Sequence, residues 1–366
     1  MNYKIEKVTK DNVKQFLHVG DFIYKGDPEY IPHITTDIQG VFDETESKFY
    51  ENGETERWVL FGENKKCAGR IAAGYQKDEK NGRIGFFECI VDLTAAKLLF
   101  QKAENWLKEK GYQSAQAPVN FGSRDSFWGL MVEGFKRPSY RENYNPKYYK
   151  GLLEGCGYSE EFSQTTSEID PKTFNFERFS KLASRVLNNE SYEFKHLDYS
   201  KVDEFADDFV YIYNAAWEQH DFFKPIKKEA LLQDMKKMKA IAPVKLNWFV
   251  YANGEPAGFY INVLDVNQVF KHVNGKLNLM GKLKFLWFKP QIDRVRGIVF
   301  GVIPAYQNKG LETGMIMKFY HEIVKMKQLK SSELSWIGDF NPKMQSLFNS
   351  LGAETSKVHY TFKKEF

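Results

Sequence analysis

Apolar and polar positions in the first half of the chain predict a strand followed by a helix. Residues 85–92 (GFFECIVD) form a short apolar run, which is typical of a buried strand. After this run, apolar side chains recur at intervals of three or four residues, and the pattern ends at Gly111. These positions predict one face of an amphipathic helix: Ala96, Leu99, Ala103, Trp106 and Leu107.

The second half has the same succession of patterns. Residues 297–302 (GIVFGV) predict a strand, and residues 333–337 predict another that leads to a helix near Asn341. Between these strands lies a second apolar helix face, formed by Ile316, Phe319, Tyr320 and Ile323. Strands and helices mixed in this order predict an α/β fold, in which mixed sheets are flanked by helices.

Two pairs of segments indicate that one domain occurs twice. Residues 58–70 (WVLFGENKKCAGR) and 248–259 (WFVYANGEPAGF) share the pattern of a β-hairpin and begin 190 positions apart. Residues 145–158 (NPKYYKGLLEGCGY) and 341–354 (NPKMQSLFNSLGAE) begin 196 positions apart. Each of the latter predicts a helix that is entered through Asn-Pro and left through Gly.

The length of 366 residues is also that of two ordinary domains. A short helix expected within residues 174–189, in a polar setting, marks the boundary between the copies. We therefore expect a first domain at 1–170, a linker helix at 171–190 and a second domain at 191–366.

Composition narrows the class of protein. The net charge of +4 is too small to argue for a nucleic-acid partner. The seven histidines form no HxH or HExxH pair, and no phosphate-binding loop, GxSxG or GxGxxG motif is present, so we expect no metal. The start of the chain is charged throughout, unlike a signal peptide, and the three cysteines lack paired spacing, so we expect a cytoplasmic protein.

One loop carries a resemblance to a known family. Residues 302–314 (VIPAYQNKGLETG) lie between a predicted strand and a predicted helix, and their V-x-P-x-Y-Q-x-x-G core resembles the acyl-CoA-binding loop of the GCN5-related N-acetyltransferase (GNAT) superfamily. Amides at a helix N-terminus bind the CoA pyrophosphate in such a loop. The resemblance implies acyl-CoA, such as acetyl-CoA, as co-substrate, bound by Gly301, Val302, Ile303, Gln307, Asn308, Lys309, Gly310, Leu311, Glu312 and Asn341.

Two residues depart from the superfamily's pattern. Glu312 stands where a small residue is usual, and Phe348 stands where a tyrosine often protonates the departing thiolate. In the first half, residues 92–96 (DLTAA) lack the glycine of the loop, so we expect one acyl-CoA site, in the second domain.

The first half has a likeness of its own. Residues 118–140 (PVNFGSRDSFWGLMVEGFKRPSY), with the Asn-Pro helix after them, resemble bacterial tandem GNAT-like proteins, near bacterial ceramide synthases. The part from 121 to 144 has no counterpart in the second copy, and its aromatic side chains favour an ordered, functional loop.

Acylation of an amine needs a group that accepts the ammonium proton and donors that polarise the thioester. The candidates for the first role are Glu333 and Asp339, which flank a strand, although either is also an ordinary solvated carboxylate. The amides of residues 301–303 are candidates for the second role. Asn341 would hold the pantetheine arm or act as a plain helix cap. The acceptor amine is expected to bind at Asn120, Arg124 and Tyr306.

Residues 269–290 (VFKHVNGKLNLMGKLKFLWFKP) have a composition of their own. They hold five lysines and no acid, with bulky apolar residues between them. This composition suits an anionic membrane surface or a lipid acceptor, so we expect peripheral membrane contact here. The alternative is a hairpin extension whose aromatic side chains pack inward.

The sequence therefore supports several functions. The first is transfer of an acyl group, such as acetyl, from CoA to a small-molecule amine. Alternatives are long-chain acyl transfer to a lipid amine at a membrane, and a non-catalytic CoA-binding protein. Transfer from aminoacyl-tRNA is disfavoured by the near-neutral charge. Either a monomer or a dimer is compatible with two domains that pair within one chain.

Overall fold

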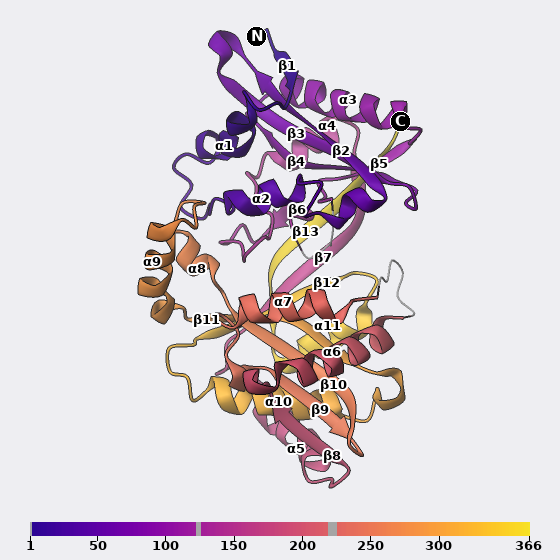
Figure 1. Ribbon diagram of the computed structural model, residues 1–366, viewed down its shortest axis with the longest axis vertical. Helices are drawn as coiled ribbons and strands as arrows, with labels where there is room; N and C mark the ends of the chain where they lie inside the picture. Colours follow the sequence, from indigo (N-terminus) through magenta and orange to yellow (C-terminus); the bar gives the residue numbers. More distant parts are fainter. Residues whose placement is uncertain (1, 122–125, 219–224) are drawn as a thin grey trace.

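The computed structural model describes residues 2–121, 126–218 and 225–366 (Figure 1). Arg124, expected at the acceptor site, lies outside these residues. The first half contains β1 (Lys4–Lys7), α1 (Val13–Ile23), α2 (Thr35–Val41), β2 (Gly53–Phe61), β3 (Cys67–Gln76), β4 (Gly82–Cys89), α3 (Leu93–Glu109), β5 (Ser114–Ala117), β6 (Leu130–Glu133), α4 (Tyr149–Gly155) and β7 (Ser159–Ile169).

The second half begins with α5 (Phe176–Leu187). It continues with β8 (Tyr192–His196), α6 (Val202–Trp217), α7 (Lys228–Met238), β9 (Trp248–Ala252), β10 (Glu255–Leu264), α8 (Asn267–Phe270), α9 (Leu279–Phe288), β11 (Arg294–Val302), α10 (Leu311–Ile323), β12 (Ser331–Gly338), α11 (Pro342–Leu351) and β13 (Glu354–Glu365). None of the helices among the described residues is long and apolar enough to span a bilayer.

The internal repeat is present in the structure. In both halves a β-hairpin leads to a third strand, a long helix, a fourth strand, the Asn-Pro helix and a long last strand. The predicted helix faces are buried: Leu99, Ala103 and Leu107 in α3 are fully covered, as is nearly all of Ile323 in α10. The predicted α/β fold with mixed sheets and flanking helices is confirmed.

The two halves share one sheet because their last strands are exchanged. The strand order is β1-β2-β3-β4-β5-β13-β7-β12-β11-β10-β9-β8. The C-terminal strand β13 pairs with β5 of the first half, while β7 pairs with β12 of the second half. In Figure 1, β13 (yellow) and β7 lie side by side where the halves meet. The sheet is therefore not divided at residue 170, where the sequence places the end of the first domain.

Helix α5 falls within the expected linker at 171–190, and it packs into the second half. Phe179, Ala183 and Val186 on α5 are buried, and the first two share a core cluster with Ile316 and Met317 of α10. Helices α5 and α10 lie together on one face of the second-half sheet. Helix α6 packs against the other face, where Phe249 and Phe259 of the sheet belong to its cluster.

Two connections differ in length between the halves. Residues 118–148 join β5 to α4, whereas residues 339–341 join the equivalent β12 and α11. In the opposite sense, residues 77–81 join β3 to β4, whereas residues 265–293, with α8 and α9, join β10 to β11. Each half thus carries one insertion that the shared fold does not require.

Candidate active site

Strands β11 and β12 run together at first and then separate. They pair in parallel from Arg294 with Ser331 to Gly297 with Leu334, and no further. At this point β11 contains a bulge, because Asn262 of β10 pairs with Gly297 and Ile261 pairs with Val299, which leaves Ile298 without a partner. The Ser335 hydroxyl donates to the Gly297 carbonyl at the point of separation. We call the opening between the two strands the fork.

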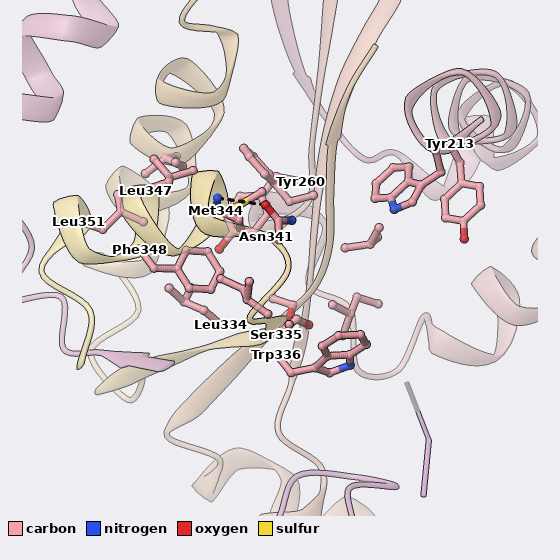
Figure 2. Close-up of a pocket in the computed structure, with 18 of the residues that line it drawn as sticks. Tyr213, Tyr260, Leu334, Ser335, Trp336, Asn341, Met344, Leu347, Phe348 and Leu351 are labelled. Carbon is pink, nitrogen blue, oxygen red and sulfur yellow. Dashed lines mark hydrogen bonds between the residues drawn. The ribbon is translucent and has the colours of Figure 1, made fainter. Parts of the chain in front are cut away.

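A cavity of about 380 Å³ occupies the fork. Figure 2 shows Tyr213 on one side of the strands and Met344, Leu347 and Leu351 on the other, so the cavity borders both faces of the sheet. None of the described residues that line it carries a formal charge. They are Phe209, Tyr213, Trp217, Tyr260, Gly297, Ile298, Val299, Phe300, Ile316, Leu334, Ser335, Trp336, Ile337, Gly338, Phe340, Asn341, Met344, Leu347, Phe348 and Leu351.

An aromatic ladder on α6 forms one wall of the cavity. Phe209, Tyr213 and Trp217 follow one another at intervals of four residues and therefore share a helix face. The Tyr213 and Trp217 rings stack at 4.7 Å. Trp217 lies so close to β11 that a Cβ at Gly301 would be 2.5 Å from its ring, and glycine is needed there. These aromatic residues were not among the predicted site residues, although their four-residue spacing was a usable signal.

Two polar residues on the other wall are held in place. Asn341 caps α11, and its side-chain oxygen accepts the Met344 amide at 3.3 Å (Figure 2). Burial raises the pKa of Tyr260, so its hydroxyl keeps its proton at neutral pH. Phe348 lines the cavity with a phenyl ring, which has no proton to give.

The loop from β11 to α10 has the geometry of an anion site. Gly310 precedes the helix with φ +85°, a conformation that favours glycine, and Asn308 is also left-handed at φ 62°. The loop therefore ends at the positive N-terminus of a 13-residue helix, with Lys309 beside it. Lys309 places its ammonium 4.6 Å from the centre of the Tyr306 ring. The Gln307 amide donates back to the Val302 carbonyl at 3.1 Å.

Glu312 folds onto this loop. Burial raises the pKa of its carboxyl group, and the backbone amides of Glu312 itself and of Asn308, which donate to the carboxylate, oppose that rise. The side chain therefore engages amides that a phosphate at this helix end needs. A ligand diphosphate at the loop competes with the Glu312 carboxylate for these amides.

Only one of the three amides expected to polarise a carbonyl faces the fork. The Ile303 amide donates to the Ala257 carbonyl of the neighbouring strand at 3.0 Å. Since alternate residues of a strand bond to opposite neighbours, the Gly301 amide also points toward β10. The amides of Phe300 and Val302 point the other way, into the fork.

Glu333 lies outside the cavity, in a buried ionic cluster. Its side chain is fully buried, 2.8 Å from Lys357 and 3.3 Å from Arg296, and it accepts the Ser139 hydroxyl. Burial alone raises the pKa of Glu333, but Lys357, Arg294 and Arg296 outweigh burial and hold the pKa well below its usual range. Such a carboxylate is a weak base. Its expected catalytic role stays a prediction that these surroundings do not favour.

This cluster joins the two halves. Lys357 of β13 also pairs with Glu142 from the long first-half insertion, and Arg294 pairs with Asp265 at 2.7 Å. Three acids therefore meet three bases: Glu142, Asp265 and Glu333 with Arg294, Arg296 and Lys357.

Asp339, Asn120 and Tyr306, which were also expected at the site, lie outside the cavity, whereas Asn341 lines it. Asp339 is exposed and accepts the Ser163 amide at 3.0 Å. Asn120 is buried within the first half, where its side chain accepts the Phe121 amide and its carbonyl accepts from Arg83. Tyr306 is half-buried beside Lys309. Among the described residues, no group of His, Cys, Asp and Glu side chains has the arrangement of metal ligands.

The equivalent place in the first half is closed. Strands β4 and β5 pair through Gly82 and Arg83, and the Val119 amide still bonds the Ile84 carbonyl at 2.8 Å beyond them. The N-terminus of α3 is capped by the Asp92 carboxylate, which accepts the amides of Thr94 and Ala95. A side-chain anion thus already occupies this helix end.

Solved structures show the class of fold. The chain is similar to a tandem GNAT protein from the clavulanic acid biosynthesis pathway, with a TM-score of 0.59, 11% identity and coverage of 100% of this chain and 98% of that one. It is also similar to a GCN5-related N-acetyltransferase from Sphaerobacter thermophilus, with a TM-score of 0.53, 9% identity and coverage of 99% and 95%. The protein has the tandem GNAT fold.

Curated proteins give two more specific likenesses. The chain is 23% identical to the bacterial ceramide synthase of Caulobacter vibrioides, over 97% of this chain and 95% of that protein. It is 22% identical to Protein YghO of Escherichia coli K12, over 98% and 94%. No family model matches the chain.

Proposed function

We propose that the protein is an acyl-CoA-dependent N-acyltransferase whose site lies in the β11–β12 fork. The observation that carries this proposal is the continuity of two features. An uncharged cavity of about 380 Å³ opens between the strands, and the strand that forms one edge leads directly into the left-handed turn at Gly310 and the N-terminus of α10. The loop suits the diphosphate of CoA, and the fork suits its pantetheine arm.

The lining favours the long-chain alternative over acetyl transfer. Aromatic and aliphatic side chains surround the cavity on both faces of the sheet. An acyl chain that enters a cavity with apolar walls is stabilised in proportion to the hydrocarbon surface it removes from water. A two-carbon acetyl group has little such surface. The likeness to a bacterial ceramide synthase points the same way. We therefore propose a long-chain acyl-CoA as donor and a lipid amine as acceptor.

The chemistry follows from these positions. The neutral amine attacks the thioester carbonyl, the C–N bond forms, and collapse of the tetrahedral intermediate breaks the C–S bond to leave an amide and a CoA thiolate. The Val302 amide, which faces the fork, polarises the carbonyl oxygen. The amine proton leaves to water, since no carboxylate lines the described cavity.

Two phenols border the cavity where the thiolate forms. Burial holds the Tyr260 proton firmly, which suits that residue to orient a substrate through a hydrogen bond. We propose that Tyr213 protonates the thiolate, in the role that Phe348 cannot fill, and regains its proton from the water that accepted the amine proton.

Thermal unfolding with CoA, acetyl-CoA and palmitoyl-CoA tests the proposal. Ligand at a hundredfold excess over its dissociation constant adds about 2.7 kcal/mol to the free energy of unfolding. We expect the largest shift with palmitoyl-CoA, lost in Gly310→Glu, which puts a side chain and a negative charge in the loop. Leu182→Glu, on the exposed side of α5, is the matched charge control. No shift with any of the three ligands would overturn the proposal.

A second candidate is a CoA-binding protein without turnover. Glu312 on the loop and Phe348 in the cavity favour it, because the first competes with the diphosphate and the second gives no proton. Glu312→Ala separates the two. If the chain is an enzyme, this variant tightens CoA binding about two- to fivefold and still forms amide from palmitoyl-CoA and a sphingoid amine. Tighter binding without product supports the second candidate.

A further inference from the structure

Helix α9 presents five large apolar side chains to solvent. Leu279, Met280, Leu283, Leu286 and Trp287 are 76, 60, 53, 66 and 77% exposed. Their spacing places them on one continuous side of the helix, which we call the α9 face. Large apolar side chains gathered in this way on a described surface mark an interaction site.

The opposite side of α9 fixes the helix to the protein. Gly281 is buried against the Lys276 carbonyl, so closely that a Cβ would not fit. The Phe285 ring lies 6.2 Å from that of Phe270, and Phe288 stacks on His272 at 3.8 Å. The alternative of an extension with inward aromatic side chains therefore holds for Phe270, Phe285 and Phe288 but not for Trp287. The helix is apolar on both sides, and the protein covers one of them.

The charged side chains within residues 269–290, which carry the α9 face, have one sign. Lys271, Lys276, Lys282 and Lys284 are exposed, and residues 269–290 contain no acid. On the helix, Lys282 and Lys284 fall on opposite edges of the apolar side. An apolar strip bordered by lysines matches the boundary between acyl chains and anionic headgroups.

The position of the segment supports a role outside the core. Residues 265–293 stand where the first half has the short turn 77–81, so the repeated fold can be connected here without helices α8 and α9. In Figure 1, α8 and α9 project from the side of the molecule, next to α2. At ten residues α9 is far too short to cross a bilayer and fits only along its surface.

We propose that the α9 face docks the protein on an anionic lipid bilayer, with α9 in the plane of the interface. The apolar side chains enter the acyl-chain boundary and the lysines contact the headgroups. Docking requires no acyl transfer, so it stands or falls independently of the function proposed above.

Vesicle flotation of the full chain tests the apolar part. The vesicles contain phosphatidylcholine with 30% phosphatidylglycerol or phosphatidylcholine alone. We expect binding to the anionic vesicles, reduced about tenfold or more in the triple variant Leu283→Ser, Leu286→Ser, Trp287→Ser. The double variant Val91→Ser, Leu182→Ser removes exposed apolar side chains elsewhere and should bind as the wild type.

A second pair of variants tests the charges. The double variant Lys276→Gln, Lys282→Gln should bind anionic vesicles more weakly, by about fivefold for each lysine removed. Added salt should also weaken the binding of the wild type. Lys236→Gln with Lys327→Gln, both exposed at distant places, should leave binding unchanged. Palmitoyl-CoA binding measured without vesicles should be the same in all variants, which separates a failure of docking from a failure of the function.

Three results would overturn the proposal: no binding to anionic vesicles, equal binding by the triple variant, or a wild-type dimer that the triple variant converts to a monomer without any lipid dependence. The last would make the α9 face an interface between copies. Should the triple variant unfold, Trp287→Phe replaces it. The wild-type minus variant fluorescence must then shift to the blue on anionic vesicles.

Discussion

The two halves build the same elements around two different junctions. In the first half the strands after the hairpin stay bonded as far as Val119, and Asp92 caps the helix between them. In the second half a bulge at Ile298 separates the strands, and Gly310 precedes the helix without a side chain to cap it. One copy of the repeat is thus closed by its own backbone and side chains. The other copy keeps a cavity of about 380 Å³.

The closed copy still contributes to the open one. Ser139 and Glu142, from the first-half insertion at 118–148, belong to the ionic cluster around Glu333. Strand β7 of the first half pairs with β12 at the edge of the fork. In this molecule one copy of the repeat forms the cavity, and the other supplies side chains and a strand that support it. Four experiments, in order of expected effect, test this difference between the halves.

The largest effect is expected from a substitution in the ionic cluster that joins the two halves. Lys357→Ala leaves Glu142 and Glu333 buried without their shared partner, and removing one member of a buried ion pair costs about 3–5 kcal/mol. Urea unfolding followed by circular dichroism measures the loss. Lys363→Ala on the same strand, where the partner Glu365 is exposed, should cost under about 1 kcal/mol. Equal losses would show that the cluster does not hold the halves together.

The next experiment tests the proposed proton donor at the fork, Tyr213. Tyr213→Phe should lower kcat for palmitoyl-CoA at least about a hundredfold, because the thiolate loses its proton donor, while KM changes little. Tyr211→Phe is the control, since Tyr211 is on the same helix and 53% exposed. Unchanged kcat in Tyr213→Phe would remove this residue from the mechanism.

The halves also bury carboxyl groups whose pKa values shift in opposite directions, so their effects on stability should depend on pH in opposite ways. The pKa of Glu333 is lowered, so its stabilising charge is present above the usual glutamate pKa and is lost as the pH falls toward the folded value. The pKa of Glu88 in the first half is raised, by burial that outweighs Arg70, so its contribution is present in acid and is lost as the pH rises.

Thermal unfolding between pH 3 and pH 7 measures this contrast. Glu333→Gln should lower the melting temperature at pH 7 and flatten its fall in acid. Glu88→Gln should lower the melting temperature at pH 7 less than Glu333→Gln does, because Glu88 pairs with one cation, Arg70, whereas Glu333 pairs with three. The opposite order of the two variants would contradict the assignment.

The smallest effects concern the two helix ends. Asp92→Ala removes a cap and should cost about 1 kcal/mol of stability without changing palmitoyl-CoA binding. Gly310→Ala should cost a similar amount, because alanine is strained at φ +85°, and it should also weaken binding. Calorimetric titration with thermal unfolding compares them. Weaker binding in Asp92→Ala would mean that the first half holds ligand too.

Much of the architecture could be read from the sequence because it depends on local periodicity. Leu99 and Leu107, or Ile316 and Ile323, mark buried helix faces in any fold, and the repeated Asn-Pro segments mark equivalent helices. The loop around Gly310 could also be recognised, because the left-handed turn and the helix start involve neighbouring residues.

The assignment of side chains to the candidate site was much less predictable. Glu333 sits on a predicted strand, but its partners Lys357, Glu142 and Ser139 come from distant segments, and only packing sets the direction of its pKa shift. The Tyr213 wall arises from a helix on the opposite face of the sheet. A one-residue bulge decides which amides face the fork.

The two copies, most of the elements that they share and the single glycine loop could be predicted from the sequence, because each depends on residues a few positions apart. The tertiary structure alone decided the exchange of β7 and β13, the closure of one junction and the opening of the other, and the exposure of the α9 face. These features follow from strand pairing and packing between segments far apart in the chain. For such contacts neither the partner nor the covered side of an element is encoded locally.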